Sequence, residues 1–546
     1  MSKKYLVDTE MLDDKMAKVD GKLSGMLAVS GQKGNQIEQR EDGIYVPKAQ
    51  EYDDTEIKKR VEDLEDSQVT VSREPDNQAE QIDDGLYVRK YDDTQINNEI
   101  SDLRSYIGYT DSDIAGLCAD FENNQFTRLA GAVGLKAGAD FDKFNAFGGR
   151  KRCIVQDNGT ILALRDDNAK TYTLTNEGKN VITTGVTNNQ ISVTAAEDGT
   201  YGQVMVYQPK FYYKVVPLKF EPVDGGVHGY KLRKENYYVS DTPKAGFKLH
   251  PAFISDGKER DYILLSAYEG CIYDVSALKY LLEDEQVADF TATTGDKLSS
   301  IANAKPCSGA TQKFNRAAAR QLAHNRGEGW ELGYTATIAA SQLLMIIEYA
   351  TFNMQTAIGK GVVNRSSGET VKTGDTGDLG NKSGTADGTD GVVSVSYRGE
   401  ENIWGNCWEF VEGAIAFAKD NRVSLYIANN RDFKDVLSDD YELYSAGLPV
   451  NTVNQHISSF IYNEKYDYMF VPSEAQGNSI NPVGDIYRTS FSQSSPIVPA
   501  CSGGCYNGID CGPFMLMIIN EVSSSFGSSG NARIVYIPKP SEEVTL

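Results

Sequence analysis

The sequence has very little histidine. Its 546 residues include only four, His228, His250, His324 and His456, which are dispersed and form no HxxxH-like set. Histidine is the side chain most often used for proton transfer near neutral pH. Glycine and tyrosine are abundant instead, with 50 and 31 residues. This composition favours a binding protein over an acid–base enzyme, and we expect no catalytic residue.

Basic residues are in deficit. The 54 lysines and arginines are outnumbered by 77 aspartates and glutamates, which gives a formal net charge of −23. A nucleic-acid-binding protein needs a basic surface to neutralise phosphates, so we expect no nucleic-acid partner. The acidity is suited to solubility or to divalent-cation binding.

Long apolar runs are missing as well. The longest, residues 339–350, is interrupted by Ser341, Gln342 and Glu348 and is shorter than the roughly 18 residues that a membrane helix needs. The first residues, MSKKYLVDTEMLDDK, contain lysines but no apolar segment typical of a signal peptide. We therefore expect no membrane insertion, synthesis in the cytoplasm, and release by lysis or a dedicated machine.

The eight cysteines form no C-x-x-C pair, which argues against a zinc ribbon or a thioredoxin-like site. An even number of cysteines in a chain made in the cytoplasm does not by itself predict disulfides. The cysteines are Cys118, Cys153, Cys271, Cys307, Cys407, Cys501, Cys505 and Cys511.

Residues 31–110 contain an internal repeat. QIEQ followed by DGIYV, at 36–46, recurs as QAEQ followed by DGLYV at 78–88. Asp-Gly before β-branched and aromatic residues predicts a turn into a short strand. Each copy is followed by Tyr-Asp-Asp-Thr, which supplies helix N-cap oxygens. We expect two repeats of a short strand and a helix.

The predicted helices share a two-per-seven apolar spacing, typical of a coiled-coil seam, and a similar helix is expected over residues 1–30. Helices this short are marginal alone, so we expect a homotrimeric stalk; isoleucine at both kinds of seam position favours three strands. The alternative is that each helix packs on its own repeat. The predicted seam residues are Leu12, Met16, Val19, Ile57, Val61, Leu64, Ile96, Ile100, Leu103 and Ile107.

The rest of the chain predicts an α+β protein. The spacing of Phe121, Phe126 and Leu129 indicates a helical connector over 111–150, and residues 151–200 read as β-rich. The strongest strand pattern is at 203–220. Helices are expected from Asn315 and over 337–352, and the Gly-, Ser- and Thr-rich stretch 362–391 is expected to be a flexible surface loop.

Residues 394–415, SVSYRGEENIWGNCWEFVEGAI, stand out because two of the three tryptophans lie among charged and amide side chains. Glycines interrupt the segment, so we expect a strand at 393–397, a tight loop, and a second strand at 407–411. Buried tryptophans beside such polar groups predict a fixed polar network.

Residues 405–410, GNCWEF, are similar to the GN-x-WEW signature of the formylglycine-generating-enzyme (sulfatase-modifying) fold, a branch of the C-type lectin-like architecture. Residues 397–406, YRGEENIWGN, resemble a subset of that fold found in phage and prophage tail proteins, including retroelement-diversified receptor-binding proteins. The resemblance implies a C-type lectin-like domain over 201–546 with two helices and loop-rich sheets. It places Trp404, Asn406, Trp408 and Glu409 in the fold core and allows a structural Ca²⁺ near Asn406 and Glu409.

The same resemblance implies that the C-terminal loops bind a ligand. Rigidly presented loops with aromatic and amide side chains suit this role, although each position could equally be an ordinary loop or core residue. The implied receptor-binding residues are Cys505, Tyr506, Asn507, Ile509 and Asp510, flanked by Tyr487, Phe491 and Phe526.

An oxidase is the alternative within this resemblance, because the enzyme family binds copper through a cysteine pair near its C-terminus. Cys501, Cys505 and Cys511 lie in the corresponding region. Activated cysteines usually need a depressed pKa and a basic neighbour, and no histidine lies nearby in the sequence. We therefore expect no enzyme and no cofactor apart from the structural Ca²⁺.

Together these features predict a bacteriophage virion protein, a trimeric tail fibre, tail-tip or head-fibre adhesin. Residues 1–30 would attach to other virion proteins, and the C-terminal domain would bind a host-surface glycan or protein. The alternatives are a non-adhesive baseplate or capsid decoration protein and, less favoured, a copper- or iron-dependent oxidase.

Overall fold

The computed structural model describes residues 109–540, except 183–185, 224–228, 286–294, 311–313, 420–421, 490–495 and 522–526, and four short strands nearer the N-terminus. The chain divides into two units, Met1–Asn97 and Asn98–Leu546, and each is described by itself.

The N-terminal unit contains two hairpins at the predicted repeats. Strands β1 (Glu38–Arg40) and β2 (Gly43–Tyr45) pair antiparallel, as do β3 (Ala79–Ile82) and β4 (Gly85–Val88). Each copy thus contains the expected strand after Asp-Gly, as β2 and β4, together with a partner strand before the turn that was not predicted. The helix at 1–30 and all ten predicted seam residues lie outside the described residues: Leu12, Met16, Val19, Ile57, Val61, Leu64, Ile96, Ile100, Leu103 and Ile107.

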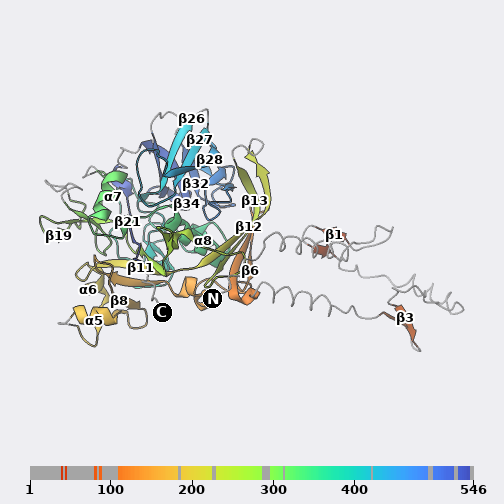
Figure 1. Cartoon of the computed structure of the whole chain (residues 1–546), viewed down its shortest axis with the longest axis horizontal. Coiled ribbons are helices and arrows are strands. Elements are labelled where there is room, and N and C mark those ends of the chain that lie inside the picture. The colour runs from red at the N-terminus through yellow and green to blue at the C-terminus, as the bar shows by residue number, and fades with distance from the viewer. Residues whose placement is uncertain are drawn as a thin grey trace, which may run out of the picture. The chain divides into compact units, whose positions relative to one another are not determined.

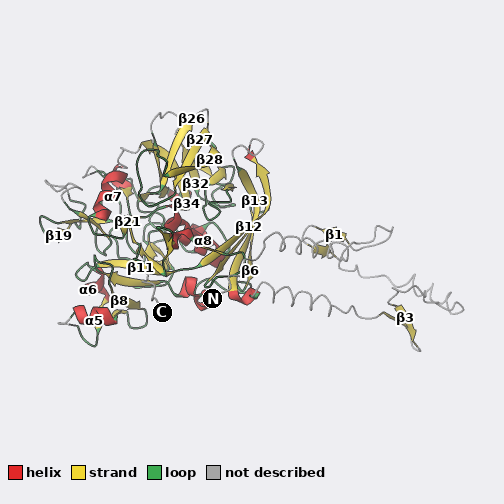
Figure 2. Ribbon diagram, in the orientation of Figure 1, coloured by secondary structure: helices red, strands yellow, loops and turns green. Residues whose placement is uncertain are grey.

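The second unit is rich in β-strands, with six α-helices among its described residues, which agrees with the α+β prediction at a coarse level (Figure 2). Asn315 caps α7 as expected, since its side chain accepts a 2.9 Å hydrogen bond from the N–H of Ala318. The helices are α4 (Asn145–Gly148), α5 (Asn176–Val181), α6 (Val193–Glu197), α7 (Arg316–His324), α8 (Thr335–Tyr349) and α9 (Met354–Ala357). None of the described helices is long and apolar enough to cross a membrane.

The first large sheet joins strands from across the unit. The predicted β-rich segment 151–200 pairs directly with later strands, because β7 pairs with β11 and β11 with β17. The expected boundary at residue 200 therefore falls within one sheet. Its order is β10 (Gln190–Ser192), β9 (Thr171–Leu174), β8 (Ile161–Asp166), β7 (Lys151–Val155), β11 (Gln203–Pro209), β17 (Tyr262–Ser266), β36 (Ile534–Tyr536) and β21 (Trp330–Leu332).

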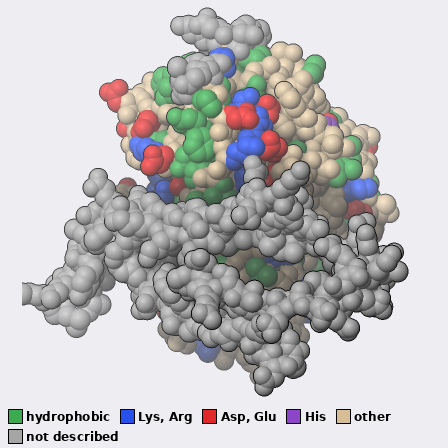
Figure 3. Space-filling view, turned by 90° about the vertical axis from the view of Figure 1, so that its right-hand side faces the viewer, with side chains coloured by type: hydrophobic (Ala, Val, Ile, Leu, Met, Phe, Trp, Pro, Cys, Tyr) green, Lys and Arg blue, Asp and Glu red, His purple; other side chains and the backbone are tan. Residues whose placement is uncertain are grey.

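The second sheet is built on the long β12–β13 hairpin, on the right in Figure 1. The outer part of this hairpin exposes Leu218, Phe220 and Tyr230. Figure 3 faces this side of the molecule, where hydrophobic side chains adjoin a group of acidic and basic ones. The strands are β14 (Lys248–Leu249), β12 (Tyr212–Pro222), β13 (Tyr230–Ser240), β30 (Ser459–Tyr462) and β31 (Pro472–Glu474), with β5 (Ile114–Asp120) and β6 (Gln125–Ala130) beside β13.

The helical connector predicted for 111–150 is wrong. The segment consists of a 3-10 turn, η1 (Asp111–Asp113), the β5–β6 hairpin, a second 3-10 turn, η2 (Ala139–Lys143), and the one-turn α4. Asn124 has φ 52°, and the carboxylate of Asp120 accepts a 3.0 Å bond from the N–H of Asn123, so these residues form a turn. Pairing with β13 then fixes β5 in the sheet.

The third sheet contains the long C-terminal strands and the second strand of the tryptophan-rich segment. Strand β25 pairs with both β33 and β35. The sheet is ordered β28 (Tyr441–Leu448), β27 (Arg422–Ala428), β26 (Ala414–Lys419), β33 (Ile497–Ser502), β34 (Gly512–Glu521), β32 (Ile486–Thr489) and β29 (Gln455–His456), with β25 (Trp408–Phe410) and β35 (Gly530–Asn531) beside it.

Three smaller sheets complete the unit. One of them carries the first strand of the tryptophan-rich segment. They are β15 (Ile254–Ser255) with β16 (Lys258–Glu259); β18 (Cys271–Asp274) with β19 (Lys279–Tyr280) and β20 (Lys297–Ser299); and β22 (Gly384–Thr385) with β23 (Val395–Tyr397) and β24 (Glu400–Glu401).

Helix α8 lies in the middle of the unit (Figure 1). Thirteen of its fifteen residues are buried, as expected for a helix that is apolar on nearly every side. Just beyond it, Phe352 packs against Phe121 from the second sheet and Phe514 from the third, with ring centroids 5.2 and 5.1 Å away. One hydrophobic core therefore connects the sheets around this helix.

Candidate functional site

The tryptophan-rich segment contains the two predicted strands, observed as β23 and β25, and a further two-residue strand, β24, that the sequence did not predict. We call residues 397–412 the latch. Ser396 pairs with Glu401 across β23 and β24, and β25 begins at Trp408, seven residues after Glu401. Arg398, Asn402 and Asn406 have positive φ values of 43°, 50° and 57°. These turns direct successive polar side chains of the latch into different parts of the interior.

The first buried contact of the latch reaches α8. The Arg398 guanidinium donates from Nε to Glu348 Oε2 at 2.7 Å and from Nη1 to Asp142 Oδ1 at 2.8 Å. Tyr397 donates its hydroxyl to the same Glu348 carboxylate at 3.1 Å. Glu348 is fully buried, so these donors compensate a charge that would be costly alone.

The two adjacent carboxylates of the latch bind different partners. Glu400 pairs with the buried Arg150 and accepts a 2.7 Å bond from the Ser341 hydroxyl on α8. Glu401 accepts the backbone N–H groups of Gly374 and Thr376, both at 2.7 Å. The latch thereby fixes the helix on one side and the glycine-rich loop on the other.

Arg533 closes the latch from the C-terminal end of the chain. It is buried, pairs with Glu409, and donates from Nη2 to the carbonyls of Glu401 and Asn402 at 2.6 and 2.8 Å. A guanidinium with several fixed donors can hold one carboxylate and two carbonyls at once.

A buried carboxyl group joins the two latch asparagines. Glu269 Oε2 accepts from the side-chain amides of Asn406 at 2.6 Å and Asn402 at 3.2 Å. Burial raises the pKa of the Glu269 carboxyl to about 8, although nearby Arg533 opposes the shift. This group is therefore largely neutral at pH 7.

The two tryptophans hold the latch in the core, as the sequence predicted. Trp404 is fully buried, and its indole Nε1 donates to the carbonyls of Lys360 and Gly359 at 3.1 and 3.3 Å. Trp408 belongs to a separate small cluster that includes Ile486 and Met515.

The side-chain oxygen atoms of Asn406 and Glu409 are not arranged to ligate the structural Ca²⁺ that the resemblance allowed. Asn406 Oδ1 accepts the N–H of Val371 at 2.8 Å, and Glu409 is paired with Arg533. A bound cation would lie beside that guanidinium and would compete for oxygens already in use. Within the described ranges, no group of three or more His, Cys, Asp or Glu residues is placed to hold a metal ion.

The stretch 362–391 differs from the flexible loop that its composition predicts. Val362 and Val363 are buried, and the N–H of Val371 is bonded to the latch side chain of Asn406. Glu401 holds two further backbone N–H groups, at Gly374 and Thr376. Hydrogen-bond acceptors from the latch therefore hold the backbone of this polar stretch in one conformation.

The latch also holds the C-terminal loop 503–511. The N–H of Cys505 donates to the carbonyl of Asn406 at 3.0 Å, and the N–H of Gly508 donates to Val363 at 2.8 Å. From α9, the Gln355 amide donates to the carbonyls of Gly508 at 2.9 Å and Cys511 at 2.7 Å. This loop is therefore fixed at both ends and in its middle.

Two predicted receptor-binding residues of this loop project from it. Tyr506 and Ile509 are 46% and 58% exposed, which is high for large apolar side chains. Asn507 and Asp510 are partly exposed: Asn507 Oδ1 accepts the N–H of Gly504 at 2.7 Å, and Asp510 contacts His456 at 3.2 Å.

Other predicted receptor-binding residues are not at the surface. Cys505 and Tyr487 are fully buried. Tyr487 lies on β32, between β34 and β29, and donates its hydroxyl to the Pro449 carbonyl at 3.0 Å. These two assignments are therefore wrong. Phe491 and Phe526 lie outside the described residues.

Sequence reasoning missed two exposed residues near this loop. Val453 and Ile480 are each 60% exposed. Asn454 donates to Asp510 at 3.1 Å, and Asn353, two residues before Gln355, donates to the Ile480 carbonyl at 3.3 Å. Long-range contacts such as these bring the loops together, so no local sequence signal could have identified Val453 and Ile480.

The cysteines near the C-terminus are not activated as thiolates. All eight cysteines of the chain are free thiols. Burial raises the pKa of Cys501 to about 12, and it also raises the pKa values of Cys505 and Cys511. A reactive or metal-binding thiolate needs the opposite shift.

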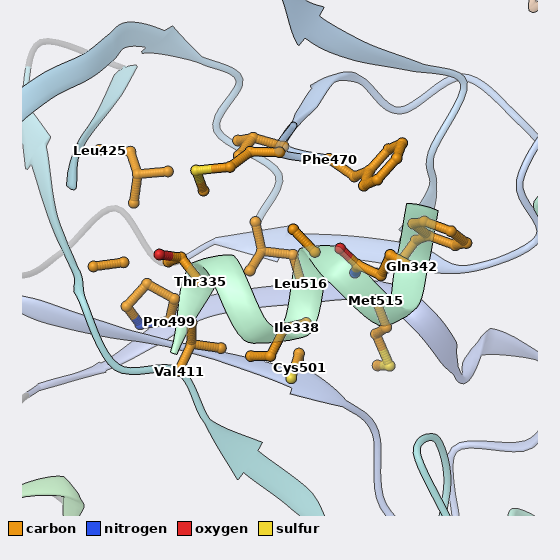
Figure 4. A pocket seen from close by; sticks show the side chains of 15 residues that line it. Thr335, Ile338, Gln342, Val411, Leu425, Phe470, Pro499, Cys501, Met515 and Leu516 are labelled. Atoms are coloured by element: carbon orange, nitrogen blue, oxygen red, sulfur yellow. The ribbon is translucent and has the colours of Figure 1, made fainter. Parts of the chain in front are cut away.

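A narrow apolar cavity of about 60 Å³ lies between α8 and the third sheet. Figure 4 shows Thr335, Ile338 and Gln342 of α8 facing Pro499 and Leu516 across it. Gln342 donates to the Pro513 carbonyl at 2.6 Å, so its amide has a partner. This space is large enough for small molecules such as water only, and we regard it as a packing gap.

No family model matches the chain, and no curated protein matches it.

Proposed function

We propose that this chain is a bacteriophage virion protein, a trimeric fibre or adhesin whose C-terminal C-type lectin-like domain binds a host cell-surface glycan or protein. The N-terminal unit attaches to other virion proteins and forms the trimeric stalk. The proposal includes no enzymatic activity, no nucleic-acid partner and no membrane insertion.

The observation that carries this proposal is the contrast between a fixed loop and its exposed side chains. Loop 503–511 is tied to the latch, to the stretch 362–391 and to α9, yet Tyr506 and Ile509 remain exposed. A loop already held in one conformation loses little entropy when it binds. Exposed aromatic and aliphatic side chains on such a scaffold are typical of recognition surfaces.

Trimerisation would strengthen weak binding by each head. Three heads on one stalk raise the effective concentration for the second and third contacts. The test is light scattering coupled to size exclusion on the full-length protein. We expect the mass of three 60.0 kDa chains, and a clean monomer would contradict the stalk.

A non-adhesive baseplate or capsid decoration protein remains the second candidate. It predicts normal incorporation into particles but no binding of the full-length protein to host cells. Saturable binding to cells, at concentrations where an unrelated acidic protein does not bind, would reject it.

The oxidase alternative predicts copper or iron in aerobically purified protein. The test is metal analysis of the parent protein and of the variants Cys501→Ser and Cys505→Ser, all purified in the same way. Stoichiometric metal that both substitutions remove would contradict the non-enzymatic proposal, and absence of stoichiometric metal from the parent would support it.

A further inference from the structure

A second surface feature, separate from loop 503–511, is a large polar cavity. It has a volume of about 900 Å³, within the range of about 300–1,000 Å³ that is usual for small-molecule sites. Its walls come from β7, β8, the turns before and within α4, the C-terminal end of α8, residues 381–383 and Arg398. The stretch 362–391 therefore helps to form one wall of this cavity.

The carboxylates that line this cavity already have partners. Asp142 accepts from Arg398 at 2.8 Å, and Asp167 Oδ1 accepts from Arg165 Nε at 3.2 Å. Asp166 Oδ1 accepts the backbone N–H groups of Asn168 and Ala169. Asp142 and Asp167 are thus paired with arginines, and Asp166 is bound by backbone N–H groups.

Two cationic side chains of the lining are not used. Lys151 and Lys382 are exposed and form no ion pair with any residue in the described part of the chain. Arg165 Nη1 also has no hydrogen-bond partner among the described residues, but this atom is buried away from solvent and does not reach the cavity. The free donors at the cavity surface are therefore the two lysines, in a chain whose net charge is −23.

The remaining lining contains hydroxyl and amide side chains beside alanines and glycines. Thr173, Ser383 and Asn168 supply polar groups, and Tyr349 supplies one aromatic ring. A small inorganic anion would leave most of this volume empty. A purely apolar ligand would leave the polar groups unpaired. A polyhydroxylated molecule would fill the volume and would form hydrogen bonds with the polar side chains of the wall.

We propose that this cavity binds a saccharide that carries a carboxylate or a phosphate, with the anionic group held by Lys151 and Lys382. The saccharide hydroxyls bond to the amide and hydroxyl side chains of the wall. The site is distinct from loop 503–511 and does not depend on the adhesin proposal, because it follows from the cavity and its unmatched donors alone.

The test is isothermal titration of the full-length protein with matched saccharides. The probes are 3′-sialyllactose and trigalacturonate, which carry carboxylates, glucose 6-phosphate, which carries a phosphate, and lactose, which is neutral. We expect at least one anionic probe to bind in the millimolar range or tighter and lactose to bind at least about tenfold more weakly. Binding should weaken as salt is raised. The carboxylate and phosphate probes distinguish the two anionic groups.

The variant Lys151→Ala/Lys382→Ala should lose about tenfold or more in affinity for the anionic probe. Both lysines are exposed, so the melting temperature should not change. The control is Lys258→Ala, an exposed lysine that does not line the cavity; it should bind like the parent. The proposal is overturned if no anionic probe binds at millimolar concentration, if lactose binds equally well, or if the double variant retains full affinity.

Discussion

The backbone carbonyl of Asn406 accepts a 3.0 Å hydrogen bond from the backbone N–H of Cys505. This bond connects the latch directly to the loop that exposes Tyr506 and Ile509. Trp408 lies under the same loop, since a Cβ atom placed on Gly504 would be 3.1 Å from its indole ring. The stability of the latch and the conformation of the binding loop should therefore change together.

Asn406→Ala tests the side-chain part of this connection. The change removes the donor to Glu269 and the acceptor for the Val371 N–H, and it places alanine at φ 57°. We expect a loss of about 2–4 kcal/mol in the free energy of unfolding. Asn303→Ala is the control, because exposed Asn303 has a similar φ of 62°. Urea titrations that give equal losses for both variants would show that the buried bonds contribute nothing.

Buried and exposed ion pairs should differ strongly in their contribution to the free energy of unfolding. Arg533→Ala leaves the Glu409 carboxylate and two carbonyls buried without a partner, so we expect a loss of about 3–5 kcal/mol. Lys539 also pairs with a glutamate, Glu328, but both side chains are more than 70% exposed. Lys539→Ala should leave the urea midpoint unchanged. Similar midpoints for the two variants would contradict the role of Arg533 in closing the latch.

The raised pKa of Glu269 predicts a specific pH dependence. The folded-state pKa is about 8, against an ordinary value of 4.5, so this group favours the folded state most below pH 4.5. That contribution is lost as the pH rises from 4.5 to 8. Glu269→Gln keeps an acceptor for the latch asparagines but cannot ionise. Its stability relative to the parent should therefore increase by at most about 1.4 kcal/mol for each pH unit across this range.

Urea midpoints measured at several pH values between 5 and 8 check this expectation. Glu328→Gln serves as the control for an exposed glutamate and should give the same curve as the parent. A constant difference between Glu269→Gln and the parent at every pH would contradict the raised pKa.

The burial of the thiols predicts slow chemical labelling. Seven of the eight cysteines are buried and Cys118 is partly buried, and burial raises the pKa of Cys501 to about 12. We expect Ellman's reagent at pH 8 to label native protein far more slowly than protein in guanidinium, where eight thiols should react without prior reduction. Fewer than eight reactive thiols in the unfolded protein would indicate disulfides and contradict the structure.

Local sequence signals predicted the elements that depend on local chemistry. The side chain of Asn315 caps α7, and the apolar residues from Leu343 to Ile347 lie in the buried helix α8. The strands at residues 395–397 and 408–410 were also predicted, because Gly399 and Gly405 interrupt the segment between them; both glycines have positive φ, 98° and 82°. The short strand β24 was not predicted.

The β5–β6 hairpin was missed because aromatic spacing outweighed a turn signal. The spacing of Phe121, Phe126 and Leu129 was interpreted as helical. In the structure the rings of Phe121 and Phe126 instead pack against each other across the hairpin, with their centroids 6.0 Å apart. Asn123 and Asn124 between them were the available signal for a turn. Pairing of β5 with β13, about a hundred residues later, decided the outcome.

The candidate site was predictable only in part. The loop around Tyr506 was identified through a resemblance, but the burial of Cys505 and Tyr487 follows from packing by distant strands. The fixed path of 362–391 depends on Glu401 and Asn406, whose roles as acceptors cannot be seen in the composition of the stretch itself. Long-range hydrogen bonds therefore account for most of what sequence reasoning could not supply.

If loop 503–511 presents a binding surface, fluorescently labelled full-length protein should bind to bacterial cells through it. The cells are those of the strain whose DNA encodes the sequence, together with close relatives. The test variant is Tyr506→Ala/Ile509→Ala. The matched control is Val133→Ala/Leu278→Ala, which removes two apolar side chains that are 64% and 74% exposed elsewhere.

We expect saturable binding by the parent and the control variant, and at least about tenfold weaker binding by Tyr506→Ala/Ile509→Ala at an unchanged melting temperature. Equal binding by the parent and both variants, or no binding by the parent to any of these cells, would contradict this expectation.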